Sequence, residues 1–519
     1  MTWATTYRVT SAGHGTGLLS SSGAQLRALL LLLCLLGQAA VVTSVVAAAP
    51  PNIVLILADD LGYAELGCYG QSKIRTPNID RLAAQGLRLT QHYSGAPVCA
   101  PARCTLMTGL HTGHAQVRGN HQMGRGQAPP QEVGQFPLTA DTITLAKALK
   151  AAGYATGAMG KWGLGPVAST GAPHKQGFEL FFGYNCQAVA HSYYPPYLWR
   201  NEELITINHN PIPGHKKQPT GEVRMEDWFD ENYAPDLMVT EAVKFVHDHQ
   251  QQPFFLFLPF IEPHVAMQPP KAIVESYPQE WDDQPYRGQS GYLPHPRPHA
   301  GYAAMITALD DHVGKVLATL DELHLTDNTL VIFTSDNGTT HAHAGDPQFG
   351  VGGVDAAFFN STAGLRGLKG SVHEGGIRVP CIVRWPGHVA PGTSSDFACY
   401  FPDYFPTLCA IAGASVPADL DGVDLTPLLK DASAAVQRKP MVWVFPEYGG
   451  QVAVRQGDYK LVRKDLKKKN QGEWELYNIA SDINETHDIA ADEPAQVQSL
   501  IDILRSQTAA NETFPLQFE

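Results

Sequence analysis

The chain has 519 residues, with 37 basic and 50 acidic side chains and a formal net charge of −13. This length exceeds that of one small core, so we expect one large domain and a smaller one. The acidic balance argues against a broad nucleic-acid-binding surface, because such a surface carries excess positive charge. It does not exclude a small anionic substrate, which needs only a local basic pocket.

An apolar segment near the N-terminus is typical of an export signal. Residues 1–58 contain no Asp or Glu, basic residues precede the apolar run Ala28–Leu36, and small residues end at Ala47–Ala49. We therefore predict a signal peptide over residues 1–49 and an exported protein, periplasmic or secreted. The alternative is an uncleaved membrane anchor, because Ala28–Ala49 is nearly long enough to span a bilayer.

Buried strands alternate with helices along most of the chain. Asn52–Ala58 is a continuous apolar run, typical of a strand buried on both faces. Further strands are predicted at Ala155–Met159, Phe254–Leu258 and Leu330–Thr334, and helices at Ile143–Ala152 and Met305–Leu320. This alternation predicts an α/β fold, with a large and mostly parallel central sheet flanked by helices.

After about residue 435 the pattern changes to short strands joined by turns. The predicted strands are Met441–Phe445, Val452–Arg455, Tyr459–Arg463 and Trp474–Tyr477, followed by a helix at Pro494–Ser506. We therefore predict a large domain at residues 50–435 and a small antiparallel α+β subdomain at residues 436–519.

Polar residues follow two of the buried strands. Asp59 and Asp60 follow the first strand, and Asp336 and Asn337 come shortly after Leu330–Thr334. The carboxyl ends of strands are where open α/β sheets bind ligands. Capping of a neighbouring helix is the ordinary alternative for each of these residues taken alone.

Cys99 stands at the predicted start of a helix. Pro101 suits the first helical turn, so Cys99 lies at the positive end of the helix, with Arg103 one turn further on the same face. A helix N-terminus with an arginine is a ready anion-binding site. A disulfide between Cys99 and Cys104, or a buried free thiol, is the alternative.

The segment Cys-Ala-Pro-Ala-Arg at 99–103 resembles the Cys-x-Pro-x-Arg signature of the sulfatase family. The resemblance extends over about residues 51–490. It is carried in order by NIVLILADDLG at 52–62, TPNIDRL at 76–82, GKW at 160–162, Pro263-His264, TSDNG at 334–338, LKGSVHEGGIRVP at 368–380 and ELYN at 475–478. It implies an alkaline-phosphatase-like fold, with 50–435 as the catalytic domain of a sulfuric ester hydrolase.

The resemblance implies that Cys99 becomes the nucleophile. In this family a maturation enzyme oxidises the cysteine to formylglycine, and the hydrated aldehyde attacks the sulfate ester. A calcium ion, which prefers oxygen ligands, polarises the nucleophile and the sulfate together. The positions that match its ligands are Asp59, Asp60, Cys99, Asp336 and Asn337.

Four charged or titratable side chains receive roles in the same way. Arg103 would hold the hydrated aldehyde, and Lys161 and Lys369 would bind sulfate oxygens and neutralise their charge. His264 would bind the substrate and protonate the leaving alcohol as general acid. Because a lysine taken alone is ordinarily a surface residue, these roles depend on the resemblance.

One position departs from the family pattern. Many sulfatases read Gly-Lys-Trp-His-Leu-Gly, whereas this chain has Gly163 in place of the histidine. We propose His191 as the substitute, because it lies in an aromatic segment that could border the cleft and stack on a sugar ring. A packing role is the alternative for this segment, which contains Tyr193, Tyr194 and Trp199. The competing histidines are His92, His111, His114 and His373.

The aromatic segment favours a sulfated saccharide over a steroid or a simple aryl sulfate as substrate. A phosphate or phosphonate ester hydrolase of the same superfamily is one alternative function. A secreted calcium-binding relative without catalysis is another, and Gly163 is the feature that favours it. The expected partners are therefore a sulfated small molecule or saccharide and the formylglycine-generating enzyme, with no nucleic acid.

Overall fold

The computed structural model describes residues 50–124, 133–210, 212–340 and 350–518. Pro50–Glu519 form one compact unit. The predicted signal peptide at 1–49 lies outside the described residues and stays a prediction. No helix in the described ranges is both long and apolar enough to cross a membrane.

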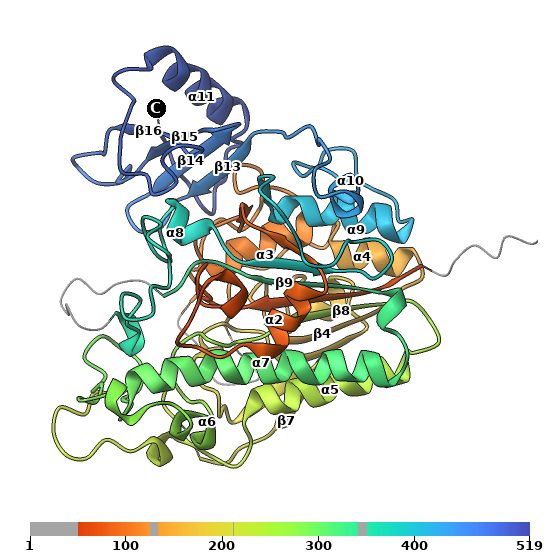
Figure 1. The fold of residues 1–519 in the computed structure, drawn as a ribbon, viewed down its shortest axis with the longest axis vertical. Coiled ribbons are helices and arrows are strands. Elements are labelled where there is room, and N and C mark those ends of the chain that lie inside the picture. Colours follow the sequence, from red (N-terminus) through yellow and green to blue (C-terminus); the bar gives the residue numbers. More distant parts are fainter. Residues whose placement is uncertain (1–49, 125–132, 211, 341–349, 519) are drawn as a thin grey trace, which may run out of the picture. The chain divides into compact units, whose positions relative to one another are not determined.

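A ten-stranded sheet forms the centre of this unit (Figure 1). Its strands lie in the order β11-β2-β10-β9-β1-β8-β4-β5-β6-β7. In chain order their bounds are β1 Asn52–Ala58, β2 Leu87–Leu89, β4 Ala155–Lys161, β5 Leu180–Tyr184, β6 Tyr197–Arg200, β7 Glu203–Thr206, β8 Phe254–Pro259, β9 Thr329–Ser335, β10 Cys381–Arg384 and β11 Thr393–Ser395. The neighbours β9, β1, β8, β4 and β5 pair in parallel, which confirms the predicted mostly parallel sheet.

Helices cover both faces of the sheet (Figure 1). β1 shows the cause, because its residues alternate between two cores: Val54 and Ile56 face one, and Ile53 and Leu55 face the other. The first face is covered by α2 Pro77–Ala84, α5 Ala234–Asp248, α6 Lys271–Glu275 and α7 Pro298–Glu322. The second is covered by α3 Cys99–Thr108, α4 Leu145–Ala151, α9 Tyr404–Ala412 and α10 Thr426–Lys430.

A second, four-stranded sheet follows α10. Its antiparallel strands are β13 Met441–Phe445, β14 Gln451–Gln456, β15 Tyr459–Arg463 and β16 Trp474–Asn478, and α11 Pro494–Ser506 packs on one face. The other face shares a core with Tyr93 and Val98, the residue before α3. The predicted small antiparallel sheet with one helix is confirmed, whereas the domain boundary at residue 435 stays a prediction.

Several short elements complete the described chain. β3 His92–Tyr93 pairs with β12 Cys399–Tyr400, and α8 Glu374–Ile377 lies before β10. The 3-10 helices are η1 Gly67–Tyr69, η2 Pro173–Lys175, η3 Val189–His191, η4 Met225–Trp228, η5 Gln279–Trp281, η6 Thr326–Asn328, η7 Val351–Gly353 and η8 Phe401–Asp403.

The register of the central strands positions the polar residues that follow them. β1 and β9 are parallel, with Ala58 opposite Ser335. The residues after both strands therefore leave the sheet side by side. β8 lies on the other side of β1, with Leu57 opposite Pro259, so the segment after β8 reaches the same edge.

Candidate active site

Three carboxylates and one amide meet at this edge of the sheet. The main-chain N–H of Asp60 donates to Asp336 Oδ1 at 3.2 Å, and Asn337 Nδ2 donates to Asp60 Oδ1 at 2.7 Å. Asp59 completes the group, and all four side chains are buried. Placing three carboxylates so close together is unfavourable unless positive charge lies among them.

Cys99, the first residue of α3, points its thiol at this group. Its Sγ lies 3.4 Å from Asp59 Oδ1 and 4.0 Å from Asp60 Oδ1. Burial and the charges of Asp336 and Asp59 raise the pKa of the thiol above its ordinary value, so the thiolate is disfavoured. Cys99 and Cys104 are both free cysteines, so the alternative of a disulfide between them is wrong.

Two buried lysines lie beside the carboxylates. Lys161 Nζ is 2.5 Å from Asp59 Oδ2, and Lys369 Nζ is 2.7 Å from Asp60 Oδ1 and 3.5 Å from Cys99 Sγ. Burial alone would lower the pKa of each ammonium, but the neighbouring carboxylates raise both pKa values above the ordinary range. Both lysines are therefore charged and available to an anion next to Cys99.

Arg103 connects two of the carboxylates. Its Nη2 lies 2.8 Å from Asp336 Oδ2 and 3.2 Å from Asp59 Oδ2, and it also donates to the main-chain oxygen of Lys161. Despite this partner, burial and the charge of Asp59 raise the pKa of Asp336 to about 6. The cations beside Asp59 hold the pKa of that carboxyl well below its ordinary value, so of these two carboxylates Asp59 is the one that stays charged.

The donor set fits a hard cation. Asn337 Oδ1 is buried and accepts no hydrogen bond from any residue that the structure describes, which is costly for a buried acceptor. Ligand atoms of Asp59, Asp60, Cys99 and Asp336 lie within 4.8 Å of one another. Carboxylate and amide oxygens are the ligands that calcium prefers, so these residues could hold it.

His264 follows β8 and faces the same group. Its Nδ1 lies 2.5 Å from the carbonyl oxygen of Val265, which places the ring proton on Nδ1 and leaves Nε2 3.6 Å from Asp60 Oδ2. The hydroxyl of Tyr193 lies 2.7 Å from the main-chain oxygens of Ile261 and His264 and so positions this loop. Burial and a neighbouring lysine lower the pKa of His264 well below its ordinary value.

A cavity of about 560 Å³ adjoins Cys99. The predicted site residues that line it are Cys99, Lys161, His191, His264 and Lys369. The other predicted residues are at most 1% exposed and are Asp59, Asp60, Arg103, Asp336 and Asn337. The structure therefore brings all ten together, five at the cavity wall and five buried.

His191 enters this cavity from η3. Its ring stacks on that of His264, with 5.1 Å between centroids and 12° between planes, and Tyr292 packs edge-on against it at 5.2 Å. Burial and neighbouring positive charges lower the pKa of His191 well below its ordinary value, so the neutral ring can accept a proton. None of the competing histidines lines the cavity; these are His92, His111, His114 and His373.

The expected aromatic border of the cleft is wrong. Tyr193, Tyr194 and Trp199 are 0%, 6% and 4% exposed, and they pack in the cores on the two faces of the sheet. Tyr292 and Tyr448 line the cavity instead. Neither is predicted from the sequence, because both lie in irregular segments with no periodic pattern.

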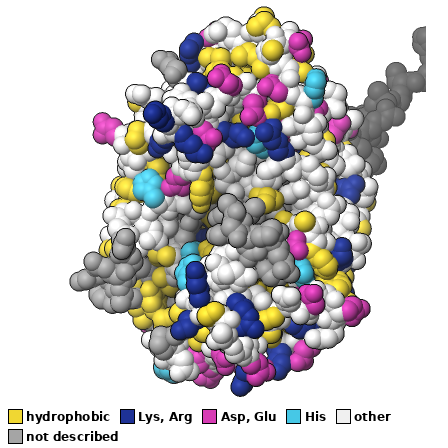
Figure 2. Space-filling model, turned by 90° about the vertical axis from the view of Figure 1, so that its left-hand side faces the viewer, with side chains coloured by type: hydrophobic (Ala, Val, Ile, Leu, Met, Phe, Trp, Pro, Cys, Tyr) yellow, Lys and Arg dark blue, Asp and Glu magenta, His cyan; other side chains and the backbone are white. Residues whose placement is uncertain are grey.

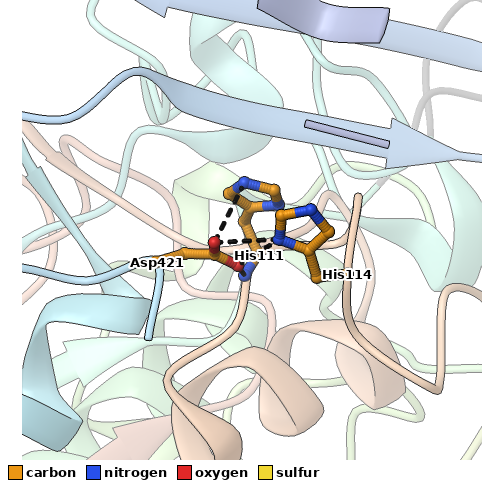
Figure 3. A group of neighbouring side chains, drawn as sticks. All are labelled: His111, His114 and Asp421. Atoms are coloured by element: carbon orange, nitrogen blue, oxygen red, sulfur yellow. Dashed lines mark hydrogen bonds and ion pairs between the residues drawn. The ribbon is translucent and has the colours of Figure 1, made fainter. Parts of the chain in front are cut away.

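His111, His114 and Asp421 form a second group of ligand-type side chains (Figure 3). The Asp421 carboxylate accepts hydrogen bonds from His114 Nδ1 and from the main-chain N–H of His111, both at 2.9 Å. Gly113 N–H donates to His111 Nδ1 at 3.2 Å, which leaves the ring proton on Nε2, the nitrogen nearer to Asp421. We therefore interpret this group as a hydrogen-bonded brace between the segment after α3 and the segment before α10.

The fold and the cavity together define a class of protein. A cysteine at a helix N-terminus, between buried lysines and clustered carboxylates at the edge of a mostly parallel sheet, is an arrangement that suits an α/β hydrolase for anionic esters. A family model described as Sulfatase matches residues 51–414, and one described as N-sulphoglucosamine sulphohydrolase, C-terminal, matches residues 368–512. The chain belongs to the sulfatase family.

Individual relatives agree with this assignment. Human arylsulfatase A is 35% identical over 79% of this chain and 74% of its own length. The N-acetylgalactosamine-6-O-sulfatase of Bacteroides thetaiotaomicron is 30% identical over 88% of this chain and 92% of its own length. The solved structure of Ps i-CgsB, also determined in complex with k-i-k-neocarrahexaose, has a TM-score of 0.69 at 28% identity and covers 88% of this chain and 92% of its own. These relatives support sulfuric ester hydrolase activity for the chain.

Proposed function

We propose that the enzyme hydrolyses sulfate monoesters of saccharides, with Cys99 converted to formylglycine and a calcium ion in the carboxylate group. One observation carries the proposal. Cys99 Sγ lies 3.4 Å from a carboxylate oxygen of Asp59 and 3.5 Å from the ammonium of Lys369, beside a cavity lined by further cationic and titratable groups. A nucleophile between a cation site and an anion site fits an attack on sulfur in an anionic ester.

Two groups complete the site. Formylglycine supplies, as its hydrate, a hydroxyl nucleophile in place of the buried thiol. Calcium, held by Asp59, Asp60, Asp336, Asn337 and residue 99, supplies polarisation of the nucleophile and of the sulfate. The buried, unpartnered oxygen of Asn337 supports such an occupant.

The proposed role of each residue follows from its position relative to residue 99. Lys161 and Lys369 line the cavity next to residue 99 and neutralise the sulfate oxygens as negative charge builds up in the transition state. Arg103 orients Asp59 and Asp336, and in this arrangement it reaches the nucleophile mainly through them. This is a positioning role, in addition to the direct contact with the aldehyde that the resemblance implies.

His264 is placed to act as general acid. The bond from Nδ1 to the Val265 carbonyl holds the ring, and Nε2 is the nitrogen that can carry a proton to the leaving oxygen. An anionic sulfate beside the ring would raise its low pKa and favour the protonated form.

The surroundings of the cavity support a saccharide as the leaving group. Tyr292 and Tyr448 line it, and aromatic rings pack well on sugar rings. Side-chain amides of Asn120, Gln122 and Gln135 add neutral donors and acceptors that suit hydroxyl groups. On the face shown in Figure 2, acidic and basic side chains are interspersed. The Bacteroides relative is named for a sulfated sugar, N-acetylgalactosamine, which also supports a saccharide substrate.

We also propose that the protein is exported, with residues 1–49 as its signal, and that it meets a formylglycine-generating enzyme before it folds. The apolar run Ala28–Leu36, in an N-terminal segment that contains no Asp or Glu, supports export. An uncleaved anchor over the same segment would place the same domain at a membrane surface.

Substrate profiling tests the proposed function. Protein produced together with the maturation enzyme should hydrolyse nitrophenyl sulfate with a much higher kcat/KM than nitrophenyl phosphate. Among sulfated monosaccharides that differ only in sulfate position, one regioisomer should be preferred. A preference for phosphate or phosphonate esters would assign the chain to the alternative activity. Calcium binding without any ester hydrolysis would identify a non-catalytic relative.

A further inference from the structure

Gly163 is packed against the side chain of Gln187. A Cβ placed on Gly163 would overlap the amide nitrogen of Gln187 and would lie 2.9 Å and 3.0 Å from its Cγ and Cδ. Gly163 also has a φ of +78°, a conformation that side-chain-bearing residues rarely adopt. The space next to Gly163, where a larger residue would place its side chain, is therefore filled by Gln187.

Gln187 is a buried polar residue without a full set of partners. Gln187 is only 5% exposed, and its main-chain N–H donates a hydrogen bond to Gln135 Oε1 at 3.1 Å. Its side-chain Nε2 is buried and makes no hydrogen bond to any residue in the described ranges. An unpaired buried amide is costly, which indicates that another group binds there in the working protein.

The position of Gln187 identifies that group. Gln187 lines the same cavity as Cys99, Lys161 and His191. The unpaired atom is a donor that lies beside Gly163, and rotation about the terminal torsion of the side chain would turn it toward the cavity. Because Lys161 and Lys369 line the same cavity and are charged, a ligand that accepts hydrogen bonds and carries negative charge is favoured there.

We propose that Gln187 binds the substrate by donating a hydrogen bond from its amide to an oxygen of the sulfate ester, and that Gly163 is required to make room for it. The inference rests on the proposed sulfatase function. Because a neutral amide neither takes nor gives a proton, Gln187 orients the sulfate, and proton transfer falls to His191 and His264. Gln187 therefore occupies the space opened by the missing histidine without replacing its acid–base chemistry.

Binding of inorganic sulfate and turnover of nitrophenyl sulfate test this contact. Gln187→Met keeps the volume and removes the donor, so both the affinity for sulfate, measured by calorimetry on the calcium-loaded enzyme, and kcat/KM should fall about 10- to 100-fold. Gln187→Glu keeps the shape but adds a charge that repels sulfate, and it should lose more than Gln187→Met. Gln187→His restores a donor and should recover part of the loss. The exposed Gln250→Met should match the parent in both measurements.

Two results would overturn the proposal. One is sulfate binding and turnover of Gln187→Met and Gln187→Glu within threefold of the parent. The other is a loss of turnover and melting temperature in these variants with unchanged sulfate affinity, which would assign Gln187 to packing alone. A parent enzyme that binds sulfate but hydrolyses no sulfate ester would refute the proposed function instead, and calorimetry would still decide the role of Gln187.

Discussion

His191 and His264 lie face to face, with 5.1 Å between their ring centroids and 12° between their planes. His191 belongs to η3, which follows β5, and His264 belongs to the segment after β8, so the order of strands in the sheet brings them together. Burial lowers the pKa of both rings well below the ordinary value for histidine. Both rings are therefore neutral, and the proposed role of His264 as acid requires the bound anionic substrate to raise its pKa.

His191→Ala should separate the two halves of turnover. If His191 is the base that assists the release of sulfate from residue 99, the first burst of nitrophenol should survive. Steady turnover should fall by about 10²-fold or more, as is usual for loss of a general base. Rapid mixing with nitrophenyl sulfate measures both phases. The exposed His247→Ala is the control, and a His191→Ala enzyme with the burst and turnover of the parent would identify His191 as a packing residue.

Cys99 should carry an aldehyde in enzyme produced with the maturation machinery. The buried thiol has a raised pKa and is a poor nucleophile as it stands, so activity should require its conversion. Mass spectrometry of the tryptic peptide Leu89–Arg103 should show sulfur replaced by oxygen with loss of two hydrogens. Cys99→Ala should abolish turnover, whereas Cys104→Ala should retain the aldehyde. Active enzyme with an unmodified thiol at residue 99 would disprove the mechanism.

Removal of calcium should lower both activity and stability. Asp59, Asp60 and Asp336 repel one another, and a cation that binds only the folded state stabilises it by about 3 kcal/mol at 100 times its Kd. Chelation should lower the melting temperature and abolish turnover, and added calcium should restore both.

Asp336→Ala should remove activity and the calcium-dependent rise in melting temperature. Asp421→Ala, in the histidine brace, should keep the calcium response, because that carboxylate lies outside the proposed metal site. Full turnover in a metal-free preparation would contradict the assignment.

His264→Ala should discriminate between leaving groups. Nitrophenolate leaves readily without a proton, so its sulfate ester should lose less than about tenfold in kcat/KM, whereas a saccharide sulfate should lose about 10²- to 10⁴-fold. Steady-state kinetics on both substrates, with aldehyde content checked for each preparation, provide the measurement. Equal slowing of the two substrates would argue against His264 as the acid.

His312 should make stability depend on pH. It lies on α7, with Nδ1 2.9 Å from Glu262 Oε1 and Nε2 3.1 Å from Asp236 Oδ1. Burial alone would lower its pKa, but these carboxylates raise it to about 9. Because the folded-state pKa exceeds the unfolded value of about 6.5, the contribution is complete below pH 6.5 and is lost as the pH rises to 9; its size is about 3 kcal/mol.

Melting curves between pH 6 and pH 9.5 should therefore separate the parent from His312→Gln. The difference in melting temperature should be largest at pH 6 and should shrink toward pH 9. A constant difference across this range would show that the charge of His312 contributes nothing.

The long central strands of the large sheet could be predicted from local patterns. β1, β8 and β9 are apolar runs long enough to be recognised, since both of their faces are buried. The other strands of this sheet, β2, β5, β6, β7, β10 and β11, have three to five residues each and were missed, because such short segments have no measurable periodicity. Their pairing depends on contacts made by the rest of the sheet.

The sequence by itself determined the fold class and the residues that meet at the end of β1 and the start of α3. Asp59, Asp60 and Cys99 occupy positions defined by the end of one strand and the start of one helix, and such positions are encoded by nearby residues. Only the tertiary structure decided which side chains line the cavity. Two examples are the contact of Gln187 with Gly163 and the stacking of His191 on His264. Each contact joins segments that follow different strands. It therefore depends on how those segments pack over the sheet rather than on any local pattern.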